Sequence, residues 1–430
     1  MPLTPNLSAL SPRNLPFDLS LLPQPTYIVG GCVRDALLGR THPYFDVDLV
    51  LPGDAVETAR QIAGYYNAGF VILDEVRRIA RVVFESGTAD FAQQMGRNLK
   101  EDLKRRDFRI NAIAYNPRTR KFIDPLKGRR DLEGRTIGAI SKANLEDDPL
   151  RLLRAYRQAA QLDFTIDPKT RTFLSQLAPN LARISAERVR QELNYLLAAP
   201  KGDRWLHAAY EDGVLPIWLA DATEESIKQI DEIDRVAWVL GTIWQDFAEY
   251  LHRPVGNSTS GLSLAKLASL VSPDPEIARS QLETLTYSRN EIRFVLTILQ
   301  HYPSILSLGN APMPLEDQYF FFQEVGNVFP ALAVFGVAGA ACRDILQENQ
   351  ATNAIAPLVN AYLDPENQAA HPVPLITGND LIRYLGLRSS PALGQLLTRL
   401  QLARVTGEIA TPEEALQFAA TLIASPSSFQ

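Results

Sequence analysis

The stretch GGCVRDALLGRTHPYFDVDLVL, residues 30–51, decides the fold of this chain. A short β-type run, YIVG, ends in its first glycine, and the pattern from 33 to 38 predicts a helix directly afterwards. Glycines at such a turn let backbone approach a phosphate, and a helix N-terminus offers free N–H groups to an anion. Gly30, Gly31 and Arg34 are therefore candidate phosphate ligands, although a plain tight turn has the same pattern. The stretch is neither a P-loop nor a GxGxxG fingerprint.

The second half of this stretch, DVDLVL, alternates as a strand does. Asp46 and Asp48 are two residues apart, so they project from the same face of the strand. Carboxylates held together repel one another unless a cation lies between them, and Mg²⁺ takes one or two carboxylates plus substrate phosphates. Two such ions could activate an attacking hydroxyl and stabilise a pyrophosphate leaving group. The alternative is an exposed strand end. Asp90, on a later predicted strand, is either a third carboxylate or a surface acid.

Arginines follow in two later motifs. Arg105 and Arg106 open the apolar pattern of RRDFRINAIAY, where they suit phosphate or base edges or simply begin a charged helix. In EDDPLRLLRAYRQAA, a proline at a helix's first turn predicts that Asp148 lies near the N-cap. Asp148 and Arg151 could offer an acceptor and a donor to a base edge. Arg151, Arg154 and Arg157 recur every three residues and therefore share one side of the helix, where they could equally form a solvated stripe.

Taken together, these motifs resemble the class II tRNA nucleotidyltransferases, the family of bacterial CCA-adding enzymes and poly(A) polymerases. The match is dense over 27–200 and weaker over 375–416, which is similar to the family's RNA-binding tail. The motifs stand in the family's order: GGCVRD, DVD, RRDF-INAIA, DPLKGRRDLE (124–133), DDPLR-LR-YR and ISAERVRQEL (184–193).

The resemblance implies the fold class, an α+β N-terminal polymerase-β-like nucleotidyltransferase palm followed by an all-α neck, body and tail. It also implies roles for single residues. Asp46 and Asp48 match the metal-binding carboxylates, Gly31 and Arg34 the triphosphate turn, and Arg106 a ribose and phosphate contact. Asp148 and Arg151 match the pair that reads the incoming base, and Arg154 and Arg157 match further nucleotide contacts. The expected divisions are an N-terminal arm at 1–26, the catalytic palm at 27–140, a base-recognising neck at 141–200, a helical body at 201–365 and a helical RNA-binding tail at 366–430.

The sequence departs from the family pattern in two ways. Arg109 replaces the usual Thr and Asp147 the frequent Glu. More importantly, only 14 residues separate Asp90 from Arg105, where CCA-adding members carry a long flexible loop needed to switch from C to A. Members that add only CC are similar to this chain in lacking the loop. The alternative is that the segment 93–100 performs its function in a short form.

Composition limits the function classes further. The 430 residues are 46% hydrophobic and 21% charged, which excludes disordered and fibrous classes. The net charge of −6 divides into +6 over 27–200 and −12 over 201–430, so a phosphate-rich partner is expected at the basic half. The longest apolar run, 328–342, is too short for a bilayer span and predicts a buried helix. Two unrelated cysteines and no apparent secretory signal fit the cytoplasm and no membrane.

We therefore expect a CTP-dependent tRNA nucleotidyltransferase that adds the CC of the CCA end. Its partners would be the tRNA acceptor stem and 3′ end, a nucleoside triphosphate and two Mg²⁺ ions, with a separate A-adding enzyme acting on the product. A complete CCA-adding enzyme or a poly(A) polymerase, which would also use ATP, is the alternative within the family. A non-catalytic RNA-binding protein is the alternative outside it, and the intact DVD motif argues against that one.

Overall fold

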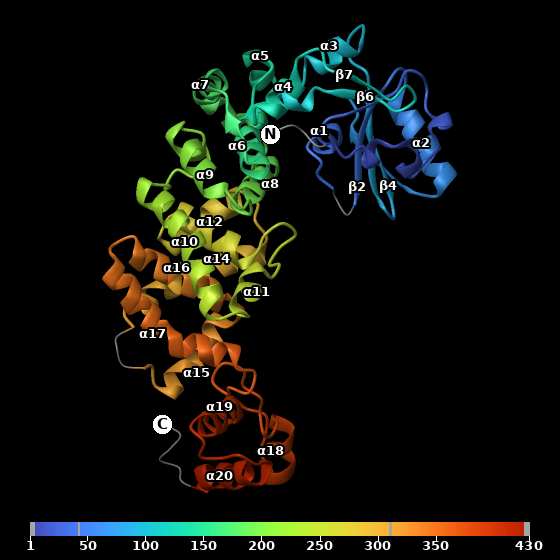
Figure 1. Cartoon of the computed structure of the whole chain (residues 1–430). Coiled ribbons are helices and arrows are strands. Elements are labelled where there is room, and N and C mark those ends of the chain that lie inside the picture. The colour runs from blue at the N-terminus through green and yellow to red at the C-terminus, as the bar shows by residue number, and fades with distance from the viewer. Residues whose placement is uncertain (1–4, 42–43, 309–311, 425–430) are drawn as a thin grey trace. The chain divides into compact units, whose positions relative to one another are not determined.

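The computed structural model describes residues 5–41, 44–308 and 312–424, so residues 1–4 of the expected arm lie outside it (Figure 1). The chain divides into two compact units, Met1–Trp218 and Leu219–Gln430. The first combines a sheet with helices, whereas the described part of the second is helical. The expected fold class, an α+β palm followed by helical regions, is confirmed.

Unit 1 is built on a seven-stranded sheet with the order β3-β4-β5-β2-β1-β6-β7. Within this sheet β2 and β5 pair in parallel, and the other neighbouring strands pair antiparallel. The central place of β2 puts the DVD motif in the middle of the sheet. The strands are β1 (Tyr27–Val29), β2 (Phe45–Leu51), β3 (Gly69–Asp74), β4 (Ile79–Phe84), β5 (Gly87–Gln93), β6 (Ala114–Asn116) and β7 (Lys121–Ile123).

Alternation along the central strands separates an apolar face from a polar one. Val47 and Leu49 of β2 and Phe91 of β5 are almost completely buried. Helix α2 (Ala55–Tyr66) covers this face, as Figure 1 shows. Asp46 and Asp48 therefore project from the opposite face, as the period of two predicts.

The N-terminal arm is better ordered than its composition suggests. It forms three short 3-10 helices, Ser8–Leu10, Pro12–Asn14 and Leu19–Leu21. Phe17 is buried and packs on Phe84 and Phe91, with ring centroids 5.9 and 5.7 Å apart. The arm thus completes the apolar face of the sheet.

The remaining elements of unit 1 place the other sequence motifs around the sheet. Two short strands, β8 (Thr136–Ile137) and β9 (Thr165–Ile166), pair in parallel and join the palm to the helices that follow. The helices are α1 (Gly31–Leu37), α3 (Leu99–Leu103), α4 (Gly128–Glu133), α5 (Lys142–Asp147), α6 (Leu150–Leu162), α7 (Pro168–Leu177), α8 (Ala186–Leu197) and α9 (Gly202–Glu211), with 3-10 turns at Arg109–Asn111, Ala178–Arg183 and Leu215–Ile217.

Unit 2 packs around one apolar helix. The predicted buried helix at 328–342 is confirmed as α16 (Phe329–Ala341), whose side chains are buried on nearly every side. The longer stretch Leu315–Ala341 has the length and composition of a membrane span, but most of it is buried within the unit. The other helices of this part are α10 (Glu224–Ile243), α11 (Phe247–His252), α12 (Gly261–Leu270), α13 (Pro275–Thr284), α14 (Arg289–Leu306), α15 (Leu315–Val325) and α17 (Ile345–Leu363), with a 3-10 turn at Gly326–Val328.

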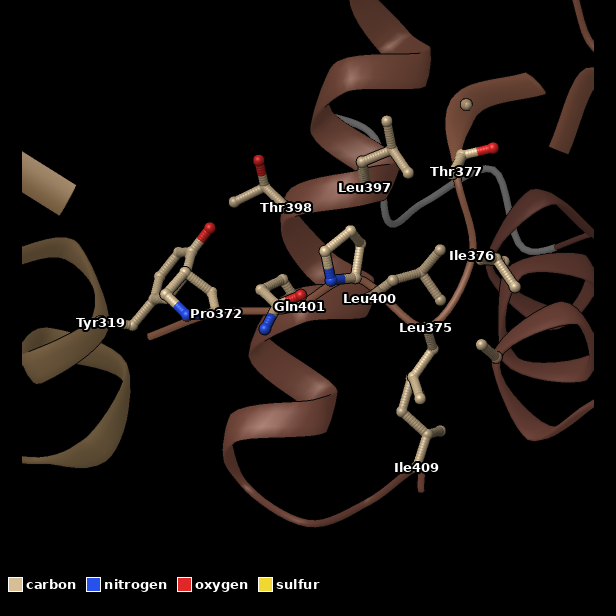
Figure 2. A pocket seen from close by; sticks show the side chains of 13 residues that line it. Tyr319, Pro372, Leu375, Ile376, Thr377, Leu397, Thr398, Leu400, Gln401 and Ile409 are labelled. Carbon is tan, nitrogen blue, oxygen red and sulfur yellow. The ribbon is translucent and has the colours of Figure 1, made fainter. Parts of the chain in front are cut away.

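The C-terminal helices α18 (Gly378–Leu385), α19 (Pro391–Val405) and α20 (Pro412–Ala424) enclose a small apolar core of their own. A pocket of about 420 Å³ lies beside α19, and Figure 2 shows Tyr319 of α15 with Leu397 and Gln401 of α19 around it. Its walls are mainly aliphatic and proline side chains.

Candidate active site

The glycine turn and the carboxylates of β2 are in direct contact. Helix α1 begins at Gly31, and Gly30 precedes it with φ +76°, a conformation that favours glycine. A Cβ atom on Gly30 would lie 2.5 Å from Asp48 Oδ2 and 3.4 Å from Arg106 Nη1. Gly30 is therefore required for close packing of Asp48 and Arg106 against the start of α1.

Three aspartates share the polar face of the sheet, each with different surroundings. Asp46 Oδ1 accepts a 2.7 Å hydrogen bond from Thr88. Asp48 lies deeper, where burial raises its pKa to about 6; Asp90 and Asp46 add to the rise and Arg106 opposes it. Asp90 is the register partner of Asp48, but Arg81 donates to both of its oxygens, at 2.6 and 2.8 Å.

These surroundings fit a divalent cation at Asp46 and Asp48. Both carboxylates project from one strand face, and their mutual repulsion is part of what raises the pKa of Asp48. Within the described ranges, no group of three His, Cys, Asp or Glu side chains is arranged to hold a metal. The donor set is thus two carboxylates, which suits a Mg²⁺ ion that completes its shell with water and phosphate oxygens.

A cavity of about 540 Å³ opens between these carboxylates and α1. Its lining includes Gly31, Arg34, Asp46 and Asp48. The space beside the glycine turn can therefore accommodate a large anion such as a triphosphate, with the first N–H groups of α1 at one side.

Arg34 is held in place by neighbours on both sides. Its guanidinium pairs with Asp35 at 2.9 and 3.0 Å, and Nη1 donates to Asn111 Oδ1 at 3.0 Å and to Gln158 Oε1 at 3.4 Å. Asn111 also donates to Asp107 and Gln158, both at 2.9 Å. Arg34 is therefore preorganised beside the cavity, and the same hydrogen bonds join the palm to α6.

A second, smaller cavity of about 170 Å³ lies at the other end of β2 and β5. Arg105, Arg106 and Arg151 line it together with Asp102. Arg106 Nη2 is 3.9 Å from Asp102, and its Nε is buried without a hydrogen-bond partner among the described residues. The orphaned Arg106 donor and the neighbouring Arg105 and Arg151 make this end of the site suited to a nucleotide's oxygens.

Asp148 lies beside the N-cap of α6, as predicted, but its side chain does not cap the helix. Pro149 is the N-cap residue, with no side-chain hydrogen bond, and Asp148 is the C-cap residue that follows helix α5. Its Oδ2 instead accepts from Arg188 of α8 at 3.0 Å, and its Oδ1 is buried with no hydrogen-bond partner in the part of the chain that the structure describes. Arg151 donates to the backbone oxygen of Asn144 at 2.8 Å, and burial lowers the pKa of its guanidinium. One acceptor of Asp148 is thus available beside Arg151.

Arg154 and Arg157 are engaged with acids inside unit 1. Arg154 donates to Asp107 at 2.9 and 3.1 Å and lies 3.6 Å from Glu192 of α8. Arg157 pairs with the same Glu192 and donates to Gln161 at 2.8 Å. The regular spacing brings these arginines to one side of α6. There their guanidinium groups contact acidic side chains, so they do not form a solvated stripe.

The sequence alone did not single out several residues that position the side chains of this site. Asp107 and Asn111 stand in the RRDFRINA motif, and Arg188 and Glu192 stand in ISAERVRQEL, so the motifs themselves were the available signal. Their partners are distant in sequence. Arg81 lies in none of the sequence motifs, and its pairing with Asp90 depends on the register between β4 and β5.

The fold and this site define a nucleotidyltransferase head followed by helical regions. Family models agree along the chain: the poly A polymerase head domain matches 26–138, the RNA and SrmB-binding site of polymerase A matches 163–226, and tRNA nucleotidyltransferase domain 2 matches 257–420. The chain belongs to the tRNA nucleotidyltransferase and poly(A) polymerase family of enzymes.

Two curated relatives and one solved structure illustrate the similarity. The CC-adding tRNA nucleotidyltransferase of Synechocystis sp. is 47% identical, over 95% of this chain and 96% of its own length. The CC-adding tRNA nucleotidyltransferase of Geobacter sulfurreducens is 31% identical, over 92% of this chain and 91% of its own length. The Thermotoga maritima CCA-adding enzyme complexed with tRNA has the same fold, with a TM-score of 0.65 over 93% and 91% of the two chains and 24% identity.

Proposed function

We propose that this chain adds CMP residues, the CC of the CCA end, to the tRNA 3′ terminus without a nucleic-acid template and releases pyrophosphate. One observation carries the proposal: Asp48 lies against the Gly30 turn and lines one cavity with Asp46, and Arg106 and Asp148 of the same unit have polar atoms without a partner among the described residues. The CC-adding relatives at 47% and 31% identity support the choice of nucleotide and acceptor.

In the proposed reaction, the tRNA 3′-hydroxyl attacks the α-phosphorus of CTP in line with the leaving pyrophosphate. The new bond joins O3′ to the α-phosphorus, the α–β bridging bond breaks, and the hydroxyl proton passes to solvent. Asp46 and Asp48 would hold Mg²⁺, which when bound supplies Lewis acidity to the hydroxyl and neutralises triphosphate charge. Asp90 contributes indirectly, since Arg81 occupies both its oxygens.

The other predicted residues bind and orient the nucleotide. Gly30 and Gly31 leave room for the triphosphate at the N-terminus of α1, and Arg34, Arg105 and Arg106 contribute positive charge around it. Asp148 Oδ1 accepts a hydrogen bond from the 4-amino group of cytosine, and Arg151 donates hydrogen bonds to the acceptor atoms of the base. Arg154 and Arg157 act through Asp107 and Glu192 by fixing α6.

The short segment between Asp90 and Arg105 supports CC addition over complete CCA addition. Gln93 ends β5 and Leu99 begins α3, so five residues connect the strand to the helix. A separate A-adding enzyme would then complete the product in the cytoplasm, which suits two free cysteines. The basic half of the chain, at +6, would hold the acceptor end.

The test is extension of a tRNA that lacks its CCA end, with CTP alone, ATP alone and both, in Mg²⁺ and in excess EDTA. We expect two added C residues with CTP and no added A in any mixture, and no product in EDTA. A complete CCA end would mean that five connecting residues suffice for switching. No nucleotide addition at all would leave the chain as an RNA-binding protein.

A further inference from the structure

Arg188 contacts the carboxylate to which we assign base reading. It lies on α8, and its Nη2 donates to Asp148 Oδ2 at 3.0 Å. Half of the Arg188 side chain is exposed, whereas Asp148 is only 14% exposed. Arg188 therefore occupies one oxygen of Asp148 from the solvent side, while the other, Oδ1, is buried and has no partner within residues 5–41, 44–308 and 312–424.

Helix α8 makes a second electrostatic contact with α6 one turn further on. Residues four apart share a helix face, so Arg188 and Glu192 lie on the same side of α8. Glu192 pairs with Arg157 and lies 3.6 Å from Arg154, in the middle of α6. Helix α8 thus makes two contacts here, one with Asp148 just before α6 begins and one with the arginines in the middle of α6.

We propose that Arg188 is a positioning residue for nucleotide selection, an inference that rests on the proposed function. Its charge-assisted hydrogen bond fixes the carboxylate plane of Asp148 and directs Oδ1 toward the 4-amino group of cytosine. UTP presents a carbonyl oxygen at that position, which a fixed carboxylate oxygen repels. Without Arg188 the carboxylate turns toward solvent, and the preference for CTP over UTP falls.

The first experiment measures kcat/KM for single-nucleotide addition to tRNA with CTP and with UTP. Arg188→Ala is expected to lower the CTP/UTP ratio about tenfold, in keeping with the loss of one charge-assisted hydrogen bond. Arg188→Lys is expected to restore part of the ratio, because an ammonium group can still donate to Oδ2. Arg183→Ala, at an exposed arginine just before α8, is the matched control and should leave the ratio unchanged.

A double-mutant cycle then separates positioning from folding. In an Asp148→Ala background, Arg188→Ala should cause no further change in the CTP/UTP ratio, because its partner is absent. Equal losses with CTP and UTP, or full additivity with Asp148→Ala, would overturn the inference and leave Arg188 a structural residue. Failure of the wild-type chain to add CMP would instead overturn the proposed function itself.

Discussion

Asp48 and Asp90 are direct neighbours across the parallel β2–β5 pair, yet only Asp90 is neutralised by an arginine. Arg81 binds both Asp90 oxygens, while Asp48 lies against the glycine turn with a pKa raised to about 6 by burial and by its acidic neighbours. The same sheet position thus gives two roles, with Asp48 available for a cation and Asp90 confined to shaping the field around it.

This difference predicts a graded effect of removing each carboxylate. Asp46→Asn and Asp48→Asn are each expected to lower CMP incorporation by about 10³-fold or more, since the bound cation loses a ligand. Asp90→Asn is expected to cost only about tenfold, because it perturbs an ion pair beside the site. Single-turnover extension with labelled CTP measures all three.

Stability provides the control for these variants. Replacing the half-buried Asp48 by the neutral Asn removes repulsion from Asp46 and Asp90, so the melting temperature without Mg²⁺ should stay equal or rise. A variant that is inactive and also unfolded would say nothing of catalysis. Near-wild-type turnover by folded Asp46→Asn or Asp48→Asn would refute the metal assignment.

Gly30→Ala should disrupt the site in two ways, by straining the backbone and by crowding the side chain of Asp48. The added Cβ would meet Asp48 Oδ2 at 2.5 Å, and φ +76° disfavours any side chain. We expect a loss of about 1–3 kcal/mol in the free energy of unfolding and a lower kcat for CMP addition. Gly53→Ala is the matched control for strain alone, since Gly53 has φ +77° and open space around it. If both variants lose kcat equally, contact with Asp48 is not the reason.

Much of this arrangement follows from local sequence, and the rest does not. The alternation of DVDLVL predicts that Asp46 and Asp48 share a face, and the glycines predict the turn into α1, because both are properties of neighbouring residues. The pairing of Arg81 with Asp90 depends on strand register and could not be read from either segment. Likewise, Asp148 fits the composition of an N-cap, but a partner 40 residues away takes its side chain.

The contribution of Asp107 to the free energy of unfolding should depend on pH. Burial alone would raise its pKa, but Arg154, Asn111 and the N–H group of Phe108 together hold that pKa below its ordinary value. The ionised pair therefore contributes fully above the unfolded pKa, about 3.9, and is lost as the pH falls through the lower folded value. Asp107→Asn should thus lower the free energy of unfolding by about 2–4 kcal/mol at pH 7, and the loss should be smaller below pH ~4.

Denaturant unfolding between pH 3 and 8 tests this expectation. Asp163→Asn is the matched control, because it removes a surface carboxylate that pairs with Lys201 at 2.9 Å and should change the stability little. A difference between wild type and Asp107→Asn that grows as the pH falls would show that the sign is wrong.

Arg151 and Arg105 line the same cavity but should affect different steps. Arg151 lies one turn from Asp148 and is partly buried, so Arg151→Ala should reduce the preference for CTP over ATP and UTP by about tenfold or more. Arg105 is exposed, and we expect it to contact the phosphates rather than the base, so Arg105→Ala should raise KM for every nucleotide similarly and leave the preference intact. Competition assays with paired nucleotides measure preference separately from KM. An unchanged CTP preference in Arg151→Ala would remove it from the base-reading pair and leave Asp148, held by Arg188, to select the base alone.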